Sequence, residues 1–212
     1  MTHCFTLSRA RRAEDAHSVV RVSAAERTGA AAAAAAAAAR ELVALLDPTD
    51  PDGVVVGAAP RAEVRRHNLP HAATGVLLRN GAGEVFVHRR TATKDVFPGC
   101  YDCLAGGVVA AGEDPAAAAR RELAEELGVR GADLRPVLRA WYRDERTHYL
   151  AHVYEARYDP ERHGPLRLQP EEVAGGEWMP PARLDRLLCD PAWPFVPDSR
   201  RLLELWPGGW QG

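Results

Sequence analysis

The chain has 212 residues, a formal net charge of -2 at pH 7 and a hydrophobic share of 46%. This size and composition predict a globular core, and the near-neutral charge gives no electrostatic support for nucleic-acid binding. No apolar run is long enough to span a bilayer, so we expect no membrane partner and a cytoplasmic location.

Residues 1–40 are predicted to be an N-terminal extension. They mix arginine, serine, alanine and acidic residues without apolar periodicity, and they contain the alanine run Ala30–Ala39. Because alanine is the best helix former, we expect a short helix or a disordered leader here. The compact domain is predicted to cover residues 41–212.

Strands and helices are mixed along this domain. Asn80-Gly81 and Gly83 lie between two β-prone runs, which is a strong signal for a hairpin. Apolar residues at three- and four-residue spacing predict helices near the C-terminus. In chain order we expect strands at 54–56, 73–78, 84–88, 106–109, 134–143, 147–158 and 177–179, and helices at 115–127, 181–188 and 198–205. This order predicts an α+β fold in which helices cover both faces of a mixed sheet.

The four cysteines carry no clear function. Cys4, Cys100, Cys103 and Cys189 do not form a disulfide-framework pattern, which favours a reducing compartment. Cys100 and Cys103 make a single CxxC pair, and a zinc site would need a second pair at suitable spacing. We therefore expect incidental cysteines.

The helix at 115–127 has clear signals at both of its ends. Asp114 is a good N-cap, and Pro115 suits the first helical position. Gly128 is a natural C-terminal stop. These local signals predict that the helix begins at residue 115 and ends near residue 127.

Three glutamates share one side of this helix. Residues three and four apart lie on the same face, so Glu122 lies with Glu125 and Glu126. Like charges at this spacing repel, whereas a hard divalent cation such as magnesium prefers such oxygen ligands. Arg121 could anchor Glu113 of the preceding loop through a bidentate contact. For three glutamates alone, a solvated, charge-rich helix face would be the preferred explanation.

The spacing around the glutamates favours the metal site. The stretch from Gly106 to Val129 reads GGVVAAGEDPAAAARRELAEELGV, and it fits G-x5-E-x7-R-E-U-x-E-E-x-G-U at every fixed position. This pattern is the Nudix box. The chain therefore resembles Nudix hydrolases.

The resemblance extends beyond the box. The segments HAATGVLLRN, VFVHRRTATKDVFPGCYD and FVPDSRRLLELW are similar to bacterial Nudix proteins related to isopentenyl-diphosphate isomerase. This kinship covers residue 41 to the C-terminus. It implies an α/β/α sandwich, a magnesium cofactor with manganese as an alternative, and hydrolysis of a nucleoside diphosphate linked to another moiety. It also implies a small-molecule diphosphate as partner, and family habit suggests a homodimer.

The resemblance further assigns residue roles. Glu122, Glu125 and Glu126 would be metal ligands, with the Gly107 carbonyl as a fourth. The general base would be Glu122 itself or a carboxylate of a late loop. In that loop Glu171 and Glu172 are candidates and Glu177 is a weaker one. We favour Glu172 because it precedes Val173 and a tryptophan-bearing strand.

Several other residues could have either a binding role or a purely structural role. Arg89, Arg90 and Lys94 follow a strand and could bind phosphate, although an ordinary solvated loop explains them as well. His71 matches a metal-binding histidine of the isomerase, but a structural or surface role is expected here. Four aromatic residues could stack on a base, although a place in the core is favoured for each of them: Trp141, Tyr142, Tyr149 and Trp178.

Two alternative functions fit the sequence less well than hydrolysis does. The isomerase itself places a proton-transferring cysteine where this chain has Gly106, and a second histidine ligand where it has Val108. Strand alternation would send Cys103 to the opposite face. The other alternative is a non-catalytic nucleotide-binding Nudix module, which would usually lose box glutamates. Hydrolysis is therefore the favoured prediction, with the substrate undefined.

Overall fold

The computed structural model describes residues 20–21 and 40–211. The alanine run, for which we predicted a helix or disorder, lies outside the described residues. The strands are β1 (Val20–Arg21), β2 (Leu42–Leu46), β3 (Val55–Pro60), β4 (His71–Arg79), β5 (Val85–Arg90), β6 (Tyr101–Asp102), β7 (Leu104–Ala105), β8 (Leu134–Arg143), β9 (His148–Arg157) and β10 (Val173–Met179). The helices are α2 (Arg61–His67), α3 (Pro115–Leu127), α4 (Pro160–His163), α5 (Pro181–Leu188) and α6 (Pro197–Glu204).

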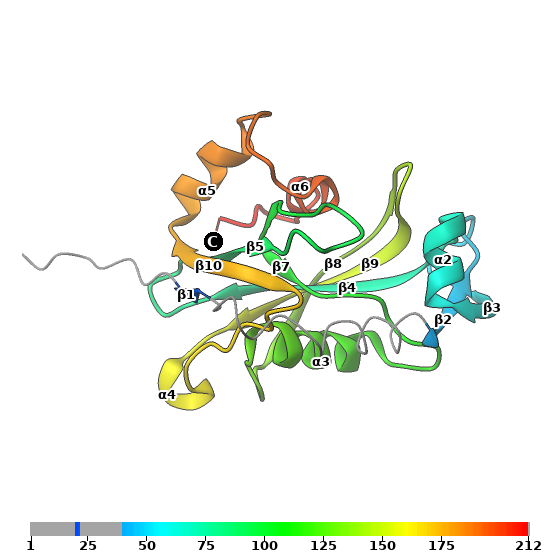
Figure 1. Cartoon of the computed structure of the whole chain (residues 1–212), viewed down its shortest axis with the longest axis horizontal. Coiled ribbons are helices and arrows are strands. Elements are labelled where there is room, and N and C mark those ends of the chain that lie inside the picture. The colour runs from blue at the N-terminus through cyan, green and yellow to red at the C-terminus, as the bar shows by residue number, and fades with distance from the viewer. Residues whose placement is uncertain (1–19, 22–39, 212) are drawn as a thin grey trace, which may run out of the picture.

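Strand β4 is the centre of a mixed sheet (Figure 1). It runs parallel to β9 in unbroken register from His71 opposite Tyr149 to Arg79 opposite Arg157. Its pairings with β2, β5 and β7 are antiparallel. The helix α3 covers one face of the sheet, and α5 and α6 lie on the other (Figure 1). The predicted α/β/α sandwich with a mixed sheet is confirmed.

Side-chain alternation along β4 builds a core on each face of the sheet. Val76 and Leu78 are buried in the cluster that contains Leu123 of α3. Leu77, which lies between them in the sequence, belongs to the cluster that contains Leu184 of α5. One strand thus anchors both helical layers, and α3 is held firmly by its apolar side.

Most predicted elements lie where the sequence placed them. The helices at 115–127 and 181–188 and the strand at 134–143 are confirmed residue for residue. The strand predicted at 106–109 is wrong: β7 ends at Ala105, and within 106–109 only Val108 makes an isolated bridge, to Ala73. Four elements of the domain were not predicted: β2, α2, β6 and α4.

The boundary between extension and domain stays a prediction. Strand β1 lies inside the predicted extension, and it pairs with β10 through Val20 opposite Gly176. Among the helices of the described part, none combines the length and apolar character that a membrane crossing would need.

The N-cap of α3 offers a test of how strongly local capping fixes this helix. Oδ1 of Asp114 accepts hydrogen bonds from the backbone N–H groups of Ala116 and Ala117, each at 3.0 Å. We predict that Asp114→Ala lowers the free energy of unfolding by about 1 kcal/mol, because two helical N–H groups lose their acceptor. Urea unfolding followed by circular dichroism measures the change.

The matched control is Asp133→Ala. That side chain is exposed and makes a surface ion pair with Arg162, which should contribute little to stability. An equal loss in both variants, or no loss in Asp114→Ala, would contradict the prediction.

Candidate active site

Arg121 ties the start of α3 to the loop before it. Its Nε and Nη2 atoms donate to the two carboxylate oxygens of Glu113 at 2.9 and 3.0 Å, which is the bidentate geometry expected for these residues. Glu113 also accepts from the backbone N–H of Ala110 at 3.1 Å. Hydrogen bonding to Arg121 lowers the pKa of Glu113, and the same contact raises the pKa of Arg121. These contacts therefore hold the loop against the helix.

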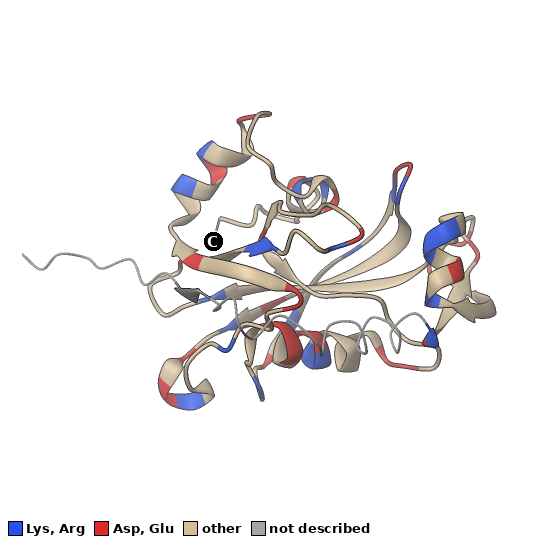
Figure 2. Cartoon of the chain, in the orientation of Figure 1, with Lys and Arg blue, Asp and Glu red and all other residues tan. Residues whose placement is uncertain are grey.

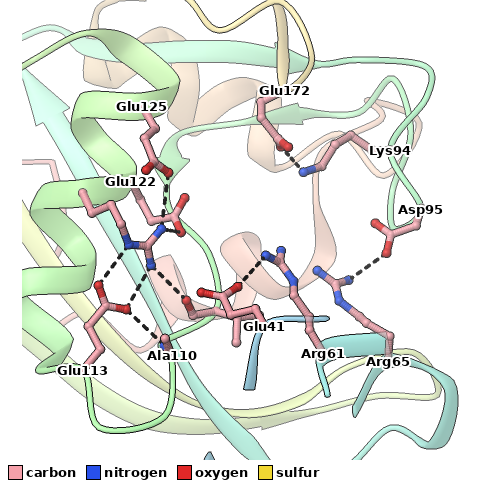
Figure 3. A network of polar contacts seen from close by, with 12 residues as sticks. Glu41, Arg61, Arg65, Lys94, Asp95, Ala110, Glu113, Glu122, Glu125 and Glu172 are labelled. Carbon is pink, nitrogen blue, oxygen red and sulfur yellow. Dashed lines mark hydrogen bonds and ion pairs between the residues drawn. The ribbon is translucent and has the colours of Figure 1, made fainter. Parts of the chain in front are cut away.

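The three glutamates of the box differ in burial. Glu122 and Glu126 are buried, whereas the side chain of Glu125 is 51% exposed. Nη1 of Arg121 donates to Glu122 at 2.6 Å and to Glu125 at 3.3 Å. Dashed lines that end on Glu122 and Glu125 mark these contacts in Figure 3. Glu126 instead accepts from the backbone N–H of Gly106 at 3.3 Å. The helix thus presents two buried carboxylates and one at its rim.

The two buried carboxylates are electrostatically unfavourable as they stand. Burial raises the pKa of Glu126 well above its ordinary value, and the neighbouring Glu122 raises it further. Burial also raises the pKa of Glu122, although Arg121 opposes the effect. A bound divalent cation would remove this cost because it stabilises the ionised form of both groups.

The donor set fits a hard cation, but it is not gathered around one point. Across residues 20–21 and 40–211, no three Asp, Glu, His or Cys side chains stand in a metal-binding arrangement. The contacts of Arg121 explain this, because they draw Glu122 and Glu125 toward the guanidinium. The Gly107 carbonyl accepts from the backbone N–H of Thr74 at 2.8 Å, so one of its two lone pairs is already used.

Two glycines let the loop pass close to these carboxylates. A Cβ at Gly107 would lie 2.6 Å from Oε1 of Glu122. A Cβ at Gly106 would lie 2.0 Å from the backbone oxygen of Thr74, which cannot move without disturbing β4. Only glycine fits at Gly106 with this backbone, and glycine at Gly107 leaves room for the carboxylate of Glu122.

The late loop before β10 brings a fourth carboxylate to the same region. Glu172 forms an ion pair with Lys94 (Figure 3). The loop is fixed by Thr91, whose hydroxyl donates to the backbone oxygen of Glu171 at 2.9 Å. Both Lys94 and Glu172 act electrostatically on the buried Glu126. Glu177 lies elsewhere, in a two-contact ion pair with Arg183.

A cleft opens beside the two glycines. Both Gly106 and Gly107 line it. Arg90 and Lys94, two of the residues predicted to bind phosphate, line it as well. Arg89 does not line the cleft, because β5 continues to Arg90 and alternation turns Arg89 to the other face. There its Nε donates to the Gly99 carbonyl at 3.0 Å. Of the three residues predicted to bind phosphate, Arg90 and Lys94 therefore line the cleft and Arg89 does not.

The floor of the cleft is lined by buried polar groups. The hydroxyl of Tyr149 donates to Asp198 at 2.7 Å, and Asp102 accepts from the backbone N–H groups of Cys103 and Leu104. Burial, together with the nearby Asp102, raises the pKa of Asp198 to about 6. Sequence reasoning had not singled out either aspartate.

The predicted aromatic and histidine residues have mixed positions. Tyr149 and His71 both line the cleft. Nδ1 of His71 donates to the Leu69 carbonyl at 2.8 Å, and burial lowers its pKa to about 4, so the ring is neutral at pH 7. Trp178 packs edge-on against Phe86 in the core. A structural role for His71 agrees with these contacts.

Helix α2 adds two cations that the sequence analysis missed. Arg61 and Arg65 line the cleft, and both lie on one face of the helix because they are four residues apart. In Figure 3 their side chains extend into the space between Glu122 and the Lys94–Glu172 pair. The only signal in the sequence was this spacing directly after Pro60.

Comparisons with known proteins give a consistent result. The family profile described as NUDIX domain matches residues 69–205. The Nudix hydrolase orf19 of Rhodococcus erythropolis is 47% identical over 175 residues, which is 77% of this chain and 90% of the relative. The Nudix hydrolase YfcD of Escherichia coli K12 is 36% identical over 161 residues, which is 76% of this chain and 85% of the relative.

Solved structures agree on the fold. The crystal structure of DR0079 from Deinococcus radiodurans has a TM-score of 0.62 and 28% identity, and the match covers 78% of this chain and 98% of that one. The MutT protein from Methanosarcina mazei Go1 has a TM-score of 0.52 at 21% identity, covering 64% of this chain and 91% of that one. The latter match shows the fold alone.

The contact between Gly107 and Glu122 can be tested by adding one methyl group. We predict that Gly107→Ala leaves the fold intact but weakens Mn²⁺ binding by about tenfold or more, since the flexible carboxylate of Glu122 must move aside and one ligand is displaced. Electron paramagnetic resonance of free Mn²⁺ measures the binding, and urea unfolding checks the fold.

Gly81→Ala is the control, because a Cβ at that position meets no other atom within 4 Å. Metal binding by Gly107→Ala that equals that of Gly81→Ala would contradict this geometry of the site.

Asp198 gives a pH test of the cleft floor. Its pKa of about 6 in the folded chain lies above the ordinary value of 3.8. Well below pH 3.8 both states hold the proton. Between about pH 3.8 and 6 the unfolded chain releases it while the folded chain still holds it, so the folded chain loses stability across this window, and above about pH 6 the loss is complete. We predict that Asp198→Asn, measured against the wild type by urea unfolding, gains on the order of 3 kcal/mol between pH 4 and pH 7.5.

The other titrating groups contribute almost equally to the stability of wild type and variant, so their contributions largely cancel in the difference between the two. A stability difference between wild type and variant that does not change with pH would show that Asp198 ionises normally in the folded chain.

Proposed function

Because the chain belongs to the Nudix hydrolases, we propose that it hydrolyses the diphosphate bond of a nucleoside diphosphate linked to another moiety, or of a similar organic diphosphate, with magnesium as its cofactor. One observation carries the proposal. The buried carboxylates of Glu122 and Glu126 lie beneath two glycines that open onto a cleft lined with cations. A cation site next to a cation-lined cleft suits a substrate with adjacent phosphates.

The proposed ligands of the metal are Glu122, Glu125, Glu126 and the Gly107 carbonyl, with manganese as an alternative to magnesium. When bound, the cation neutralises the diphosphate and polarises the phosphorus that is attacked. Arg121 is the proposed positioning residue, since its contact with Glu113 holds the loop against the helix. Binding requires Glu122 and Glu125 to turn away from its guanidinium.

Glu172 is the proposed general base. It lies on the loop beside the box helix, and its ion pair with Lys94 brings an acceptor for a proton and a donor for phosphate together. When a phosphate oxygen takes the ammonium of Lys94, the Glu172 carboxylate becomes free to accept a proton from the attacking water. Glu122 is the alternative base. Glu171 is a weaker candidate, and Glu177, which pairs with Arg183 away from Lys94, is the least favoured.

Arg90 and Lys94 are the proposed phosphate-binding residues among the predicted trio. Both line the cleft and both act electrostatically on Glu126. Arg89 leaves this set because it lies on the opposite face of β5, against the ring of Tyr101. The ligand is thus a small molecule whose phosphates lie between the box helix and the loop that carries Lys94.

An isomerase like isopentenyl-diphosphate isomerase is the alternative with the least support. It would need a cysteine at the position of Gly106, where any Cβ meets the backbone of Thr74. Cys103 is buried in the core beneath α5 and α6, and burial raises the pKa of its thiol well above the ordinary value. A kinship to isomerase-related Nudix proteins remains our proposal from the sequence motifs.

Two isosteric variants test the proposal together. We predict that Glu126→Gln abolishes magnesium-dependent turnover, whereas Glu172→Gln lowers kcat by about a hundredfold or more and leaves metal binding unchanged. The assay incubates a panel of organic diphosphates with magnesium and detects phosphate-containing products.

Glu161→Gln on the exposed helix α4 is the control and should keep wild-type activity. Unchanged turnover in Glu126→Gln would reject the metal site. Binding of nucleotides by the wild type without turnover of any compound would favour a non-catalytic module.

A further inference from the structure

Helix α2 holds Arg61 and Arg65 in fixed positions beside the cleft. The helix has one fully buried residue, Val64, which packs with Val43 of β2 and Val108 of the loop before α3. The packing of Val64 sets the rotation of the helix. It turns the two arginines toward the cleft, which both of them line.

Neither arginine has a strong partner. Arg61 contacts Glu41 through one nitrogen at 3.4 Å, and Arg65 contacts Asp95 through one nitrogen at 3.6 Å. Asp95 is 64% exposed, so its attraction is weakened by water. The pair between Arg121 and Glu113, by comparison, has two contacts at 2.9 and 3.0 Å. A stronger anion would therefore displace both partners easily.

Buried donors on this side of the cleft lack acceptors. The Nε atoms of Arg65 and Arg90 are both buried and have no hydrogen-bond partner among the residues that the structure describes. Burial lowers the pKa of Arg65, and the charges of Arg61 and Arg90 lower it further. Such a group gains most from an anion that accepts two parallel hydrogen bonds, and phosphate does this well.

The cationic side chains that line the cleft exceed what a diphosphate alone requires: Arg61, Arg65, Arg90, Lys94 and Arg146. Arg90 and Lys94 come from β5 and the loop after it, next to Glu126 and Glu172. Arg61 and Arg65 come from a different element. A diphosphate esterified at both ends has one ionised oxygen on each phosphorus, and a divalent cation would already balance that charge.

We propose that Arg61 and Arg65 form a second anion subsite that binds a further phosphate of the substrate, beyond the diphosphate held near Arg90 and Lys94. This inference rests on the proposed function, since it divides the same cleft into two subsites. The preferred substrates are then compounds in which the moiety attached to the diphosphate is itself a phosphate or carries one. Neutral sugars attached to a diphosphate are poor ligands.

Equilibrium binding of two matched compounds tests the subsite. A nucleoside triphosphate and the nucleoside diphosphate–hexose with the same base are titrated into the full chain in EDTA by calorimetry. We expect the wild type to bind the triphosphate more tightly. Arg61→Gln and Arg65→Gln should each weaken triphosphate binding by about tenfold or more, while binding of the hexose compound changes little.

Arg66→Gln is the matched control on the same helix. Its side chain is 66% exposed, pairs with Glu63 and does not line the cleft, so both affinities should stay at their wild-type values. Arg65→Lys keeps the charge but loses the planar pair of donors, and its affinity for the triphosphate should lie between those of wild type and Arg65→Gln. This variant also covers the case in which Arg65→Gln does not fold.

Three results would overturn the inference. The first is equal affinity of the wild type for both compounds, or no binding of either. The second is an equal loss for both compounds in the arginine variants, which would place the arginines on the diphosphate itself. The third is the same loss in Arg66→Gln, which would indicate a long-range field only.

Hydrolysis is measured separately with magnesium. Selective binding without any hydrolysis would reject the proposed function and leave the subsite standing. Hydrolysis without selectivity would reject the subsite alone.

Discussion

Two carboxylates, those of Glu122 and Glu126, are buried beside each other on a helix whose apolar side is locked into the core. Burying like charges together costs free energy, and the raised pKa of Glu126 is the expression of that cost. The helix tolerates this cost because Leu123 and Leu127, each next to a glutamate in the sequence, are buried in the core and hold the helix in place. The surrounding features follow from this constraint: the glycines above the carboxylates, the arginine beside them and the cation-lined cleft in front of them. Figure 2 shows acidic and basic positions next to each other along α3.

Arg121 makes the strained arrangement tolerable. It neutralises Glu122 and Glu125 directly and is itself held by the bidentate contact with Glu113. A lysine would supply the charge but not the planar set of donors that reaches three carboxylates and the Val108 carbonyl. The guanidinium therefore joins the loop to the helix and also competes with any cation for the same oxygens. The affinity of the proposed metal site would therefore depend on how strongly a cation attracts these carboxylates compared with Arg121.

The sequence predicted the bounds of α3 correctly because the signals for them are local. The Asp114 cap, the Gly128 stop and the three- and four-residue spacing are all contained in one short stretch, and each needs no tertiary partner to be recognised. Helix α2 gave no such signals. It follows Pro60, whose side chain cannot cap, and it has only Val64 as a buried residue, so its amphipathic period is too weak to detect. Arg61 and Arg65 were missed for that reason. Arg89 was grouped with Arg90 because β5 was expected to end two residues earlier, and a strand that continues sends neighbours to opposite faces.

Gly106 shows how a spacing rule in a sequence can encode a contact between backbones. The residue lies against Thr74 and Gly75 of β4, where any side chain would collide with the backbone of the central strand. Its N–H donates to Glu126, so the same close approach that requires glycine also brings a donor to the more deeply buried of the two box carboxylates. A cysteine at this position would force the loop away from β4, and Glu126 would lose that donor. Packing against β4 therefore favours glycine at position 106 over a cysteine with a proton-transferring thiol. The same packing supports the buried carboxylate of Glu126.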